Sequence, residues 1–138
     1  MTKVKRSYSK NLRNEISVLF EVIILENKTT NSNSKTSKYF EGSTIPDISI
    51  KKYISRLSRY LNFDSSTLII SLIYIDRICD SENFKLTQNN FHRLFLISLL
   101  TAIKYNEDKI YNNEFFAKIR GIKLQKVNFL ESLFLINI

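Results

Sequence analysis

The two most apolar stretches of the chain are LIISLIYI at residues 68–75 and LFLISLLTAI at residues 94–103. Both are longer than a typical strand, and neither contains the glycine or proline that would mark a turn. Wound as helices, they would be apolar on nearly every face. A helix of that kind lies in the middle of a bundle, with neighbours on several sides. The sequence therefore predicts an all-α fold with two central helices, one ending near residue 80 and the other spanning about 88–105.

Three further helices are predicted around these two. Apolar residues at helical spacing predict a helix over about 47–62, with Pro46 near its first turn. A short helix is expected over about 113–119, followed by Gly121, which suits a C-terminal cap because glycine accepts positive φ. The last helix is predicted over about 124–136. Residues 39–138 are therefore expected to form one five-helix domain.

The first 38 residues differ in composition from this domain. Residues 1–10 are predicted to be a flexible basic tail. Residues 11–26 place apolar side chains at helical spacing, so an additional N-terminal helix is expected. Residues 27–38 read NKTTNSNSKTSK, a polar, low-complexity sequence that predicts a disordered linker.

The net charge is +8, but it is unevenly distributed. Residues 1–60 contain 12 Lys and Arg against 5 Asp and Glu, whereas residues 61–138 contain 9 against 8. Binding of nucleic-acid phosphates requires a basic stripe on the folded surface. Nucleic acid is therefore not the expected partner, and the basic tail is interpreted as a solvated terminus. A localisation signal or phosphate-contacting arm is the alternative for the tail.

Several functional classes find no support in the sequence. Cys79 is the only cysteine and His92 the only histidine, so no usual metal site is predicted. His92 is interpreted as a hydrogen-bonding histidine at the core edge, and the Glu107-Asp108 pair as a polar loop cap. No catalytic residues and no cofactor are predicted, because phosphate-binding loops and kinase motifs are absent. The chain is expected not to be an enzyme.

The apolar stretches are also too short for a membrane span, which needs ~20 residues. The first residues lead into polar sequence and not into an apolar signal core. We therefore expect a cytoplasmic or nuclear protein.

Several short sequences resemble the cyclin box in their order and approximate spacing. The strongest is Tyr74-Ile75-Asp76-Arg77-Ile78, which resembles the Tyr-Ile-Asp-Arg signature of cyclins. The others resemble the P/U (phosphate-regulatory) branch and together cover roughly residues 40–138. They are PDISI at 46–50, YISRL at 53–57, NFHRL at 90–94, AIKY at 102–105, YNN at 111–113, FAKI at 116–119 and NFLE at 128–131.

This resemblance implies a single five-helix cyclin box preceded by an extra helix. It also implies that the chain binds and activates a cyclin-dependent protein kinase, in the cell cycle or in phosphate signalling. Lys104 and Glu131 occupy the positions that hydrogen-bond backbone groups near the kinase's mobile C-helix, with apolar contact from Tyr105 and Leu135. The alternative for the charged pair is an ordinary solvated lysine and glutamate. The alternative function is a cyclin-fold module that binds nucleic acid or a transcription factor.

Asp76 is expected to have a structural role. It lies in an apolar run and is therefore expected to be partly buried, and a buried carboxylate needs a partner. Arg56 and Lys52 are the candidate partners.

Overall fold

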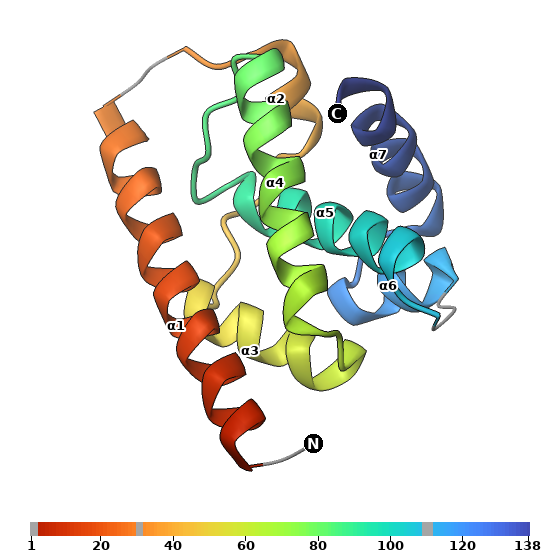
Figure 1. Ribbon diagram of the computed structural model, residues 1–138. Helices are drawn as coiled ribbons and strands as arrows, with labels where there is room; N and C mark the ends of the chain where they lie inside the picture. Colours follow the sequence, from red (N-terminus) through yellow and green to blue (C-terminus); the bar gives the residue numbers. More distant parts are fainter. Residues whose placement is uncertain (1–2, 30–31, 109–111) are drawn as a thin grey trace.

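The computed structural model describes residues 3–29, 32–108 and 112–138, with side chains described from Lys10 onward. These residues form helices and loops, and no strand occurs among them, which confirms the all-α prediction (Figure 1). The helices are α1 (Lys3–Glu26), α2 (Lys35–Tyr39), α3 (Ile50–Leu61), α4 (Ser65–Ser81), α5 (Phe91–Asn106), α6 (Asn113–Arg120) and α7 (Leu124–Asn137), with a 3₁₀ turn at Asn27–Thr29. None of the described helices is long and apolar enough to cross a membrane.

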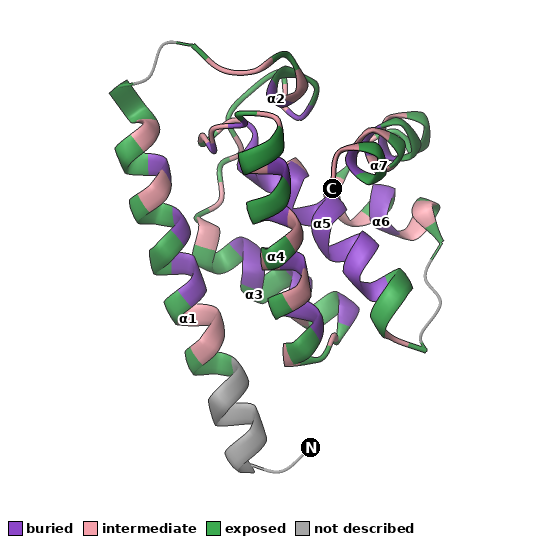
Figure 2. Cartoon of the chain, turned by 45° about the horizontal axis from the view of Figure 1, so that its top comes forward, coloured by how far each residue is buried: buried purple, intermediate pink, exposed green. Residues whose placement is uncertain are grey.

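Helix α5 is the centre of the core. Apart from Arg93, every residue from Phe91 to Ile103 is buried, and the helix packs against α4 and α7 (Figure 2). The prediction of a central helix is correct here. A helix that is enclosed along its length can hold its last, emerging residues in a fixed position.

Helix α4 was predicted to be central as well, and that prediction is wrong. Leu68, Ile75 and Ile78 are buried, but Ile69 and Ile73 are each 47% exposed. Helix α4 therefore buries one side against α5 and α7 and leaves the side with Ile69 and Ile73 open. Apolar composition alone did not reveal how many neighbours would cover the helix.

The boundaries of the other helices follow from their caps. Helix α3 starts at Ile50, three residues later than predicted, because the Ser49 hydroxyl accepts a hydrogen bond from the Lys52 amide at 3.2 Å. Pro46 therefore precedes the helix. Asn112 caps α6 through the Phe115 amide at 3.0 Å. Gly121 has φ of 69°, as its predicted C-cap role requires.

The additional N-terminal helix is present, but it is longer than predicted. Helix α1 begins at Lys3, so the flexible tail expected over residues 1–10 is wrong for residues 3–10, whereas residues 1–2 lie outside the described residues. Basic residues are good helix formers, so their charge did not imply disorder. Helix α1 runs along one side of the molecule (Figure 1) and buries Ile16, Phe20 and Ile24 in the core.

The disordered linker expected over residues 27–38 is also wrong for its described part, which leaves out residues 30–31. The Asn33 amide pairs with both backbone groups of Lys85, donating to its carbonyl at 2.8 Å and accepting from its N–H at 2.9 Å. Asn27 donates to the Leu86 carbonyl at 3.1 Å. Ser37 is fully buried in α2. The polar side chains thus satisfy backbone groups of the loop between α4 and α5.

Replacing Asn33 with alanine is expected to lower the free energy of unfolding by about 1–3 kcal/mol, because the part-buried Lys85 amide loses its partner. Urea unfolding would measure the change. The control is Ser32→Ala at the exposed neighbouring position, for which we expect a change within about 0.5 kcal/mol. Equal effects of the two substitutions would show that the Asn33 bonds do not hold the segment in place.

Candidate functional site

Lys104 and Glu131, 27 positions apart in the sequence, form an ion pair on the surface. Lys104 lies in the last turn of α5, immediately after the buried Ile103, and Glu131 lies in the middle of α7. Lys104 Nζ is 2.7 Å from Glu131 Oε2, with the two side chains 33% and 16% exposed. The structure therefore brings together the two charged residues singled out in the sequence.

A third residue, Asn113, joins this pair into a network. Lys104 Nζ also donates to Asn113 Oδ1 at 2.7 Å, and Asn113 Nδ2 donates to Glu131 Oε1 at 2.9 Å and to Asn128 Oδ1 at 2.7 Å. The network connects the end of α5, the start of α6 and the outer side of α7, which lie side by side (Figure 1). Its members fix one another's side-chain positions, so the charges are oriented before any partner arrives.

The network retains hydrogen-bonding capacity for a partner. An ammonium group has three donors, and the two bonds to Asn113 and Glu131 use two of them. Each Glu131 oxygen accepts one of these bonds and has a second lone pair available. The site can therefore donate to a carbonyl and accept from an N–H of another protein at the same time.

Apolar side chains flank the network. Tyr105 is 70% exposed next to Lys104. On α7, Leu124 and Leu135 are each 39% exposed, and helical spacing places them on the same face as Asn128 and Glu131. We call this surface the α5–α7 face and define it by Lys104, Tyr105, Asn113, Leu124, Asn128, Glu131 and Leu135.

Asn113 and Asn128 were missed as candidate site residues, although both lie in sequences quoted for the cyclin resemblance. An asparagine at the start of a helix is usually interpreted as a cap, and here Asn112 has that role. The available signal was the second asparagine of the pair. Because Asn112 already caps the helix, the side chain of Asn113 is not needed for capping and can bond elsewhere.

The expectation that Asp76 is partly buried is wrong. Ile69, Ile73 and Asp76 follow at i, i+4 and i+7 on the outward side of α4, and Asp76 is exposed. Among the described residues it forms no ion pair within 4.0 Å, either with Arg56 or with Lys52. Arg56 instead lies over the ring of Tyr60, with Cζ 5.8 Å from the ring centroid.

His92 and Glu107 have the structural roles expected of them. His92 is buried, its Nε2 lies 3.3 Å from the Ile48 carbonyl oxygen, and burial lowers the pKa of its imidazole. Glu107 Oε2 accepts from the Asp64 amide at 3.2 Å and from Thr67 Oγ1 at 2.6 Å, at the start of α4. Within the described residues, no three His, Cys, Asp or Glu side chains are placed to hold a metal ion.

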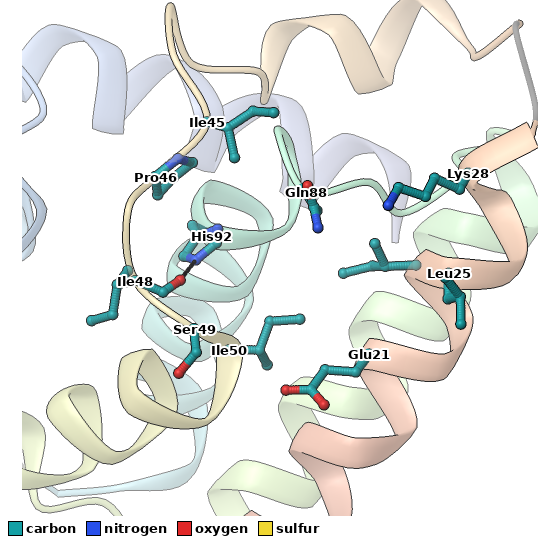
Figure 3. A pocket seen from close by; sticks show the side chains of 11 residues that line it. Glu21, Leu25, Lys28, Ile45, Pro46, Ile48, Ser49, Ile50, Gln88 and His92 are labelled. Carbon is teal, nitrogen blue, oxygen red and sulfur yellow. Dashed lines mark hydrogen bonds between the residues drawn. The ribbon is translucent and has the colours of Figure 1, made fainter.

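An apolar hollow of about 400 Å³ lies at the other end of α5, between α1 and residues 45–50 (Figure 3). His92 and its hydrogen bond to Ile48 are at its side. The twelve-residue separation of His92 and Lys104 along one helix corresponds to about 18 Å. The hollow is therefore separate from the α5–α7 face.

Comparison with known proteins gives one consistent result. The family model described as Cyclin matches residues 3–138. Cyclin-U4-3 of Arabidopsis thaliana is 36% identical over 124 residues, which are 89% of this chain and 56% of the relative. Cyclin-P4-1 of Oryza sativa subsp. japonica is 40% identical over 100 residues, 72% of this chain and 47% of the relative. The chain spans about half the length of the curated relatives that it matches.

Proposed function

Since this chain belongs to the cyclin family, in its P/U branch, we propose that it is a regulatory subunit that binds and activates a cyclin-dependent protein kinase. The observation that carries this proposal is the α5–α7 face. This face combines a rigid polar network with exposed apolar side chains. The network keeps hydrogen-bond donors and acceptors that are not used within the chain. Charged groups that are already held in position within an apolar surface set the orientation of a protein partner.

The proposed mechanism is selection of the active kinase conformation. A kinase without its cyclin holds its C-helix outward, with the catalytic Lys–Glu ion pair open. The α5–α7 face would bind the inward position, with Lys104 and Glu131 hydrogen-bonding backbone groups next to that helix. Tyr105 and Leu135 would provide apolar contact. The cyclin can shift this equilibrium only by its difference in affinity for the two states.

The structural support for selection is the rigidity of the face. Lys104 follows the fully enclosed part of α5, and Glu131 is held through Asn113 to α6. A face with fixed geometry loses little conformational entropy on binding and discriminates between two positions of a partner helix. In this proposal the chain performs no chemistry itself, and the kinase transfers the phosphoryl group.

Co-purification with candidate cyclin-dependent kinases tests the proposal. We expect one kinase to form a stable complex with the chain and to phosphorylate a generic protein substrate faster in its presence. Kinase binding would bury about 2,000 Å² in total. The competing function is nucleic-acid binding, suggested by the net charge of +8. Failure of every kinase to bind, together with salt-sensitive DNA binding, would favour that alternative.

A further inference from the structure

A second hollow, of about 280 Å³, lies between residues 42–47, the first turn of α5 and the end of α6. Its lining includes Arg93 and Arg120, from α5 and α6 respectively. We call it the two-arginine pocket. The pocket differs from the larger apolar hollow beside α1 because its exposed surface is mostly polar.

The cations at this pocket have no carboxylate partner among the described residues. The ion pairs within 4.0 Å in that part of the chain are Lys104–Glu131 and Lys118–Glu114, and neither involves an arginine. Every Asp and Glu of the sequence lies within the described ranges. Asp47 also lines the pocket, but its exposed carboxylate pairs with neither guanidinium. Two half-buried arginines therefore line one hollow, and no carboxylate of the described residues pairs with either positive charge.

The charges also lie close enough to oppose one another. Burial lowers the pKa of the Arg93 guanidinium, and the charge of Arg120 lowers it further. Burial likewise lowers the pKa of Lys126, with a further contribution from Arg93. Like charges that are brought together and partly desolvated are unfavourable unless an anion joins them.

Both guanidiniums are nevertheless held in position. Arg93 Nη1 donates to the Glu41 carbonyl at 3.1 Å, and Arg120 Cζ lies 5.7 Å from the centroid of the Tyr53 ring. Arg120 Nε is buried without a hydrogen-bond partner, as is Oδ1 of Asn89, another lining residue. Among the residues that line the pocket, Arg120 Nε is therefore a positioned N–H donor without a partner.

We propose that the two-arginine pocket binds a phosphate group, either as a free ion or as part of a phosphorylated side chain. Guanidinium groups match a tetrahedral oxyanion because their paired N–H donors contact two oxygens at once. A water molecule takes up about 30 Å³ in the liquid, so the hollow has room for an ion several times larger. This inference goes beyond the proposed kinase function and does not depend on it.

The pocket and the α5–α7 face can be occupied together. Eleven residues along α5 separate Arg93 from Lys104, which corresponds to about 16 Å. Helix α6 connects the two regions, since Asn113 at its start belongs to the network and Arg120 at its end lines the pocket. A phosphate in the pocket would therefore leave the polar network accessible.

Calorimetric titration with inorganic phosphate, and separately with a phosphoserine peptide, tests the proposal at constant ionic strength. We expect saturable binding of at least one probe, and a rise in Tm that equal concentrations of chloride do not produce. The Arg93→Gln/Arg120→Gln variant should bind about tenfold more weakly or worse, because charge-assisted hydrogen bonds are lost. The control, Arg59→Gln/Arg77→Gln, removes the same charge from exposed positions and should bind as the wild type does.

Each outcome decides the matter. Binding of free phosphate that the pocket variant loses supports an ion site, and binding of the phosphopeptide alone supports recognition of a modified partner. No binding of either probe, or equal binding by pocket and control variants, overturns the proposal. If loss of Arg120 prevents folding, Arg93→Lys keeps the charge but removes the paired donors, and it should still weaken the affinity.

Discussion

Replacing Lys104 and Glu131 together with alanine is expected to weaken kinase binding by about 30-fold or more and to abolish activation. Truncating hydrogen-bonded charges that a partner encloses costs about 2–5 kcal/mol, and each 1.4 kcal/mol is a factor of about ten. The loss would combine two effects: the missing bonds to the kinase and the missing orientation of Asn113, which contacts both side chains. Affinity from a binding titration and the initial rate of substrate phosphorylation measure the two consequences.

The folded state of this variant should be nearly unchanged. Lys104 is one-third exposed, and ion pairs at a protein surface contribute about 0–1 kcal/mol to stability. A circular dichroism melting curve would therefore separate a binding defect from unfolding.

The matched control is Lys118→Ala/Glu114→Ala. It removes the same two residue types from an exposed pair on α6, 3.7 Å apart, with side chains 76% and 60% exposed. We expect this control to bind and activate the kinase normally. Loss of binding in the control as well would mean that net surface charge matters and not the network. Normal activity of the Lys104/Glu131 variant would remove the α5–α7 face from the proposed mechanism.

The sequence allowed α5 to be predicted better than α4, although both are apolar. In α5, eight residues from Leu94 to Thr101 are all buried, so composition and environment agree. In α4, Ile69 and Ile73 are exposed and Asp76 lies on the same outward stripe. The number of neighbours around a helix is a property of the whole fold. A run of isoleucines does not specify it.

The polar contacts were less predictable than the helices, because they connect distant parts of the chain. Asn33 forms hydrogen bonds with the backbone of Lys85, 52 positions away in the sequence, and Asn113 forms one with Glu131, 18 positions away. Nothing in the local pattern NSNSK distinguishes an asparagine that clamps a loop from one in solvent. Lys104 and Glu131 were selected only through the resemblance to cyclins, since neither residue stands out by spacing or composition.

Replacing Phe20 with alanine is expected to lower the free energy of unfolding by about 3–5 kcal/mol, the usual cost of deleting a buried phenylalanine ring. Phe20, on α1, packs its ring against two phenylalanine rings of α5. Its ring centroid lies 4.7 Å from that of Phe91 and 6.2 Å from that of Phe95, and only 3% of Phe20 is exposed. A domain of this size has about 5–15 kcal/mol of stability in total, so the loss is a large part of it. Urea unfolding would measure the change.

The control is Leu19→Ala, the adjacent residue of α1, which is 52% exposed and should change the stability by less than about 1 kcal/mol. Equal effects at both positions would show that α1 is only loosely attached to the helical core.

Kinase affinity provides a second criterion. Phe20 contacts the first turns of α5, whereas Lys104 lies in its last turn, about 14–20 Å away along the helix. The folded fraction of Phe20→Ala should therefore bind the kinase with nearly wild-type affinity. The two substitutions thus have opposite effects, since Phe20→Ala reduces stability and spares binding, whereas the Lys104/Glu131 variant spares stability and loses binding.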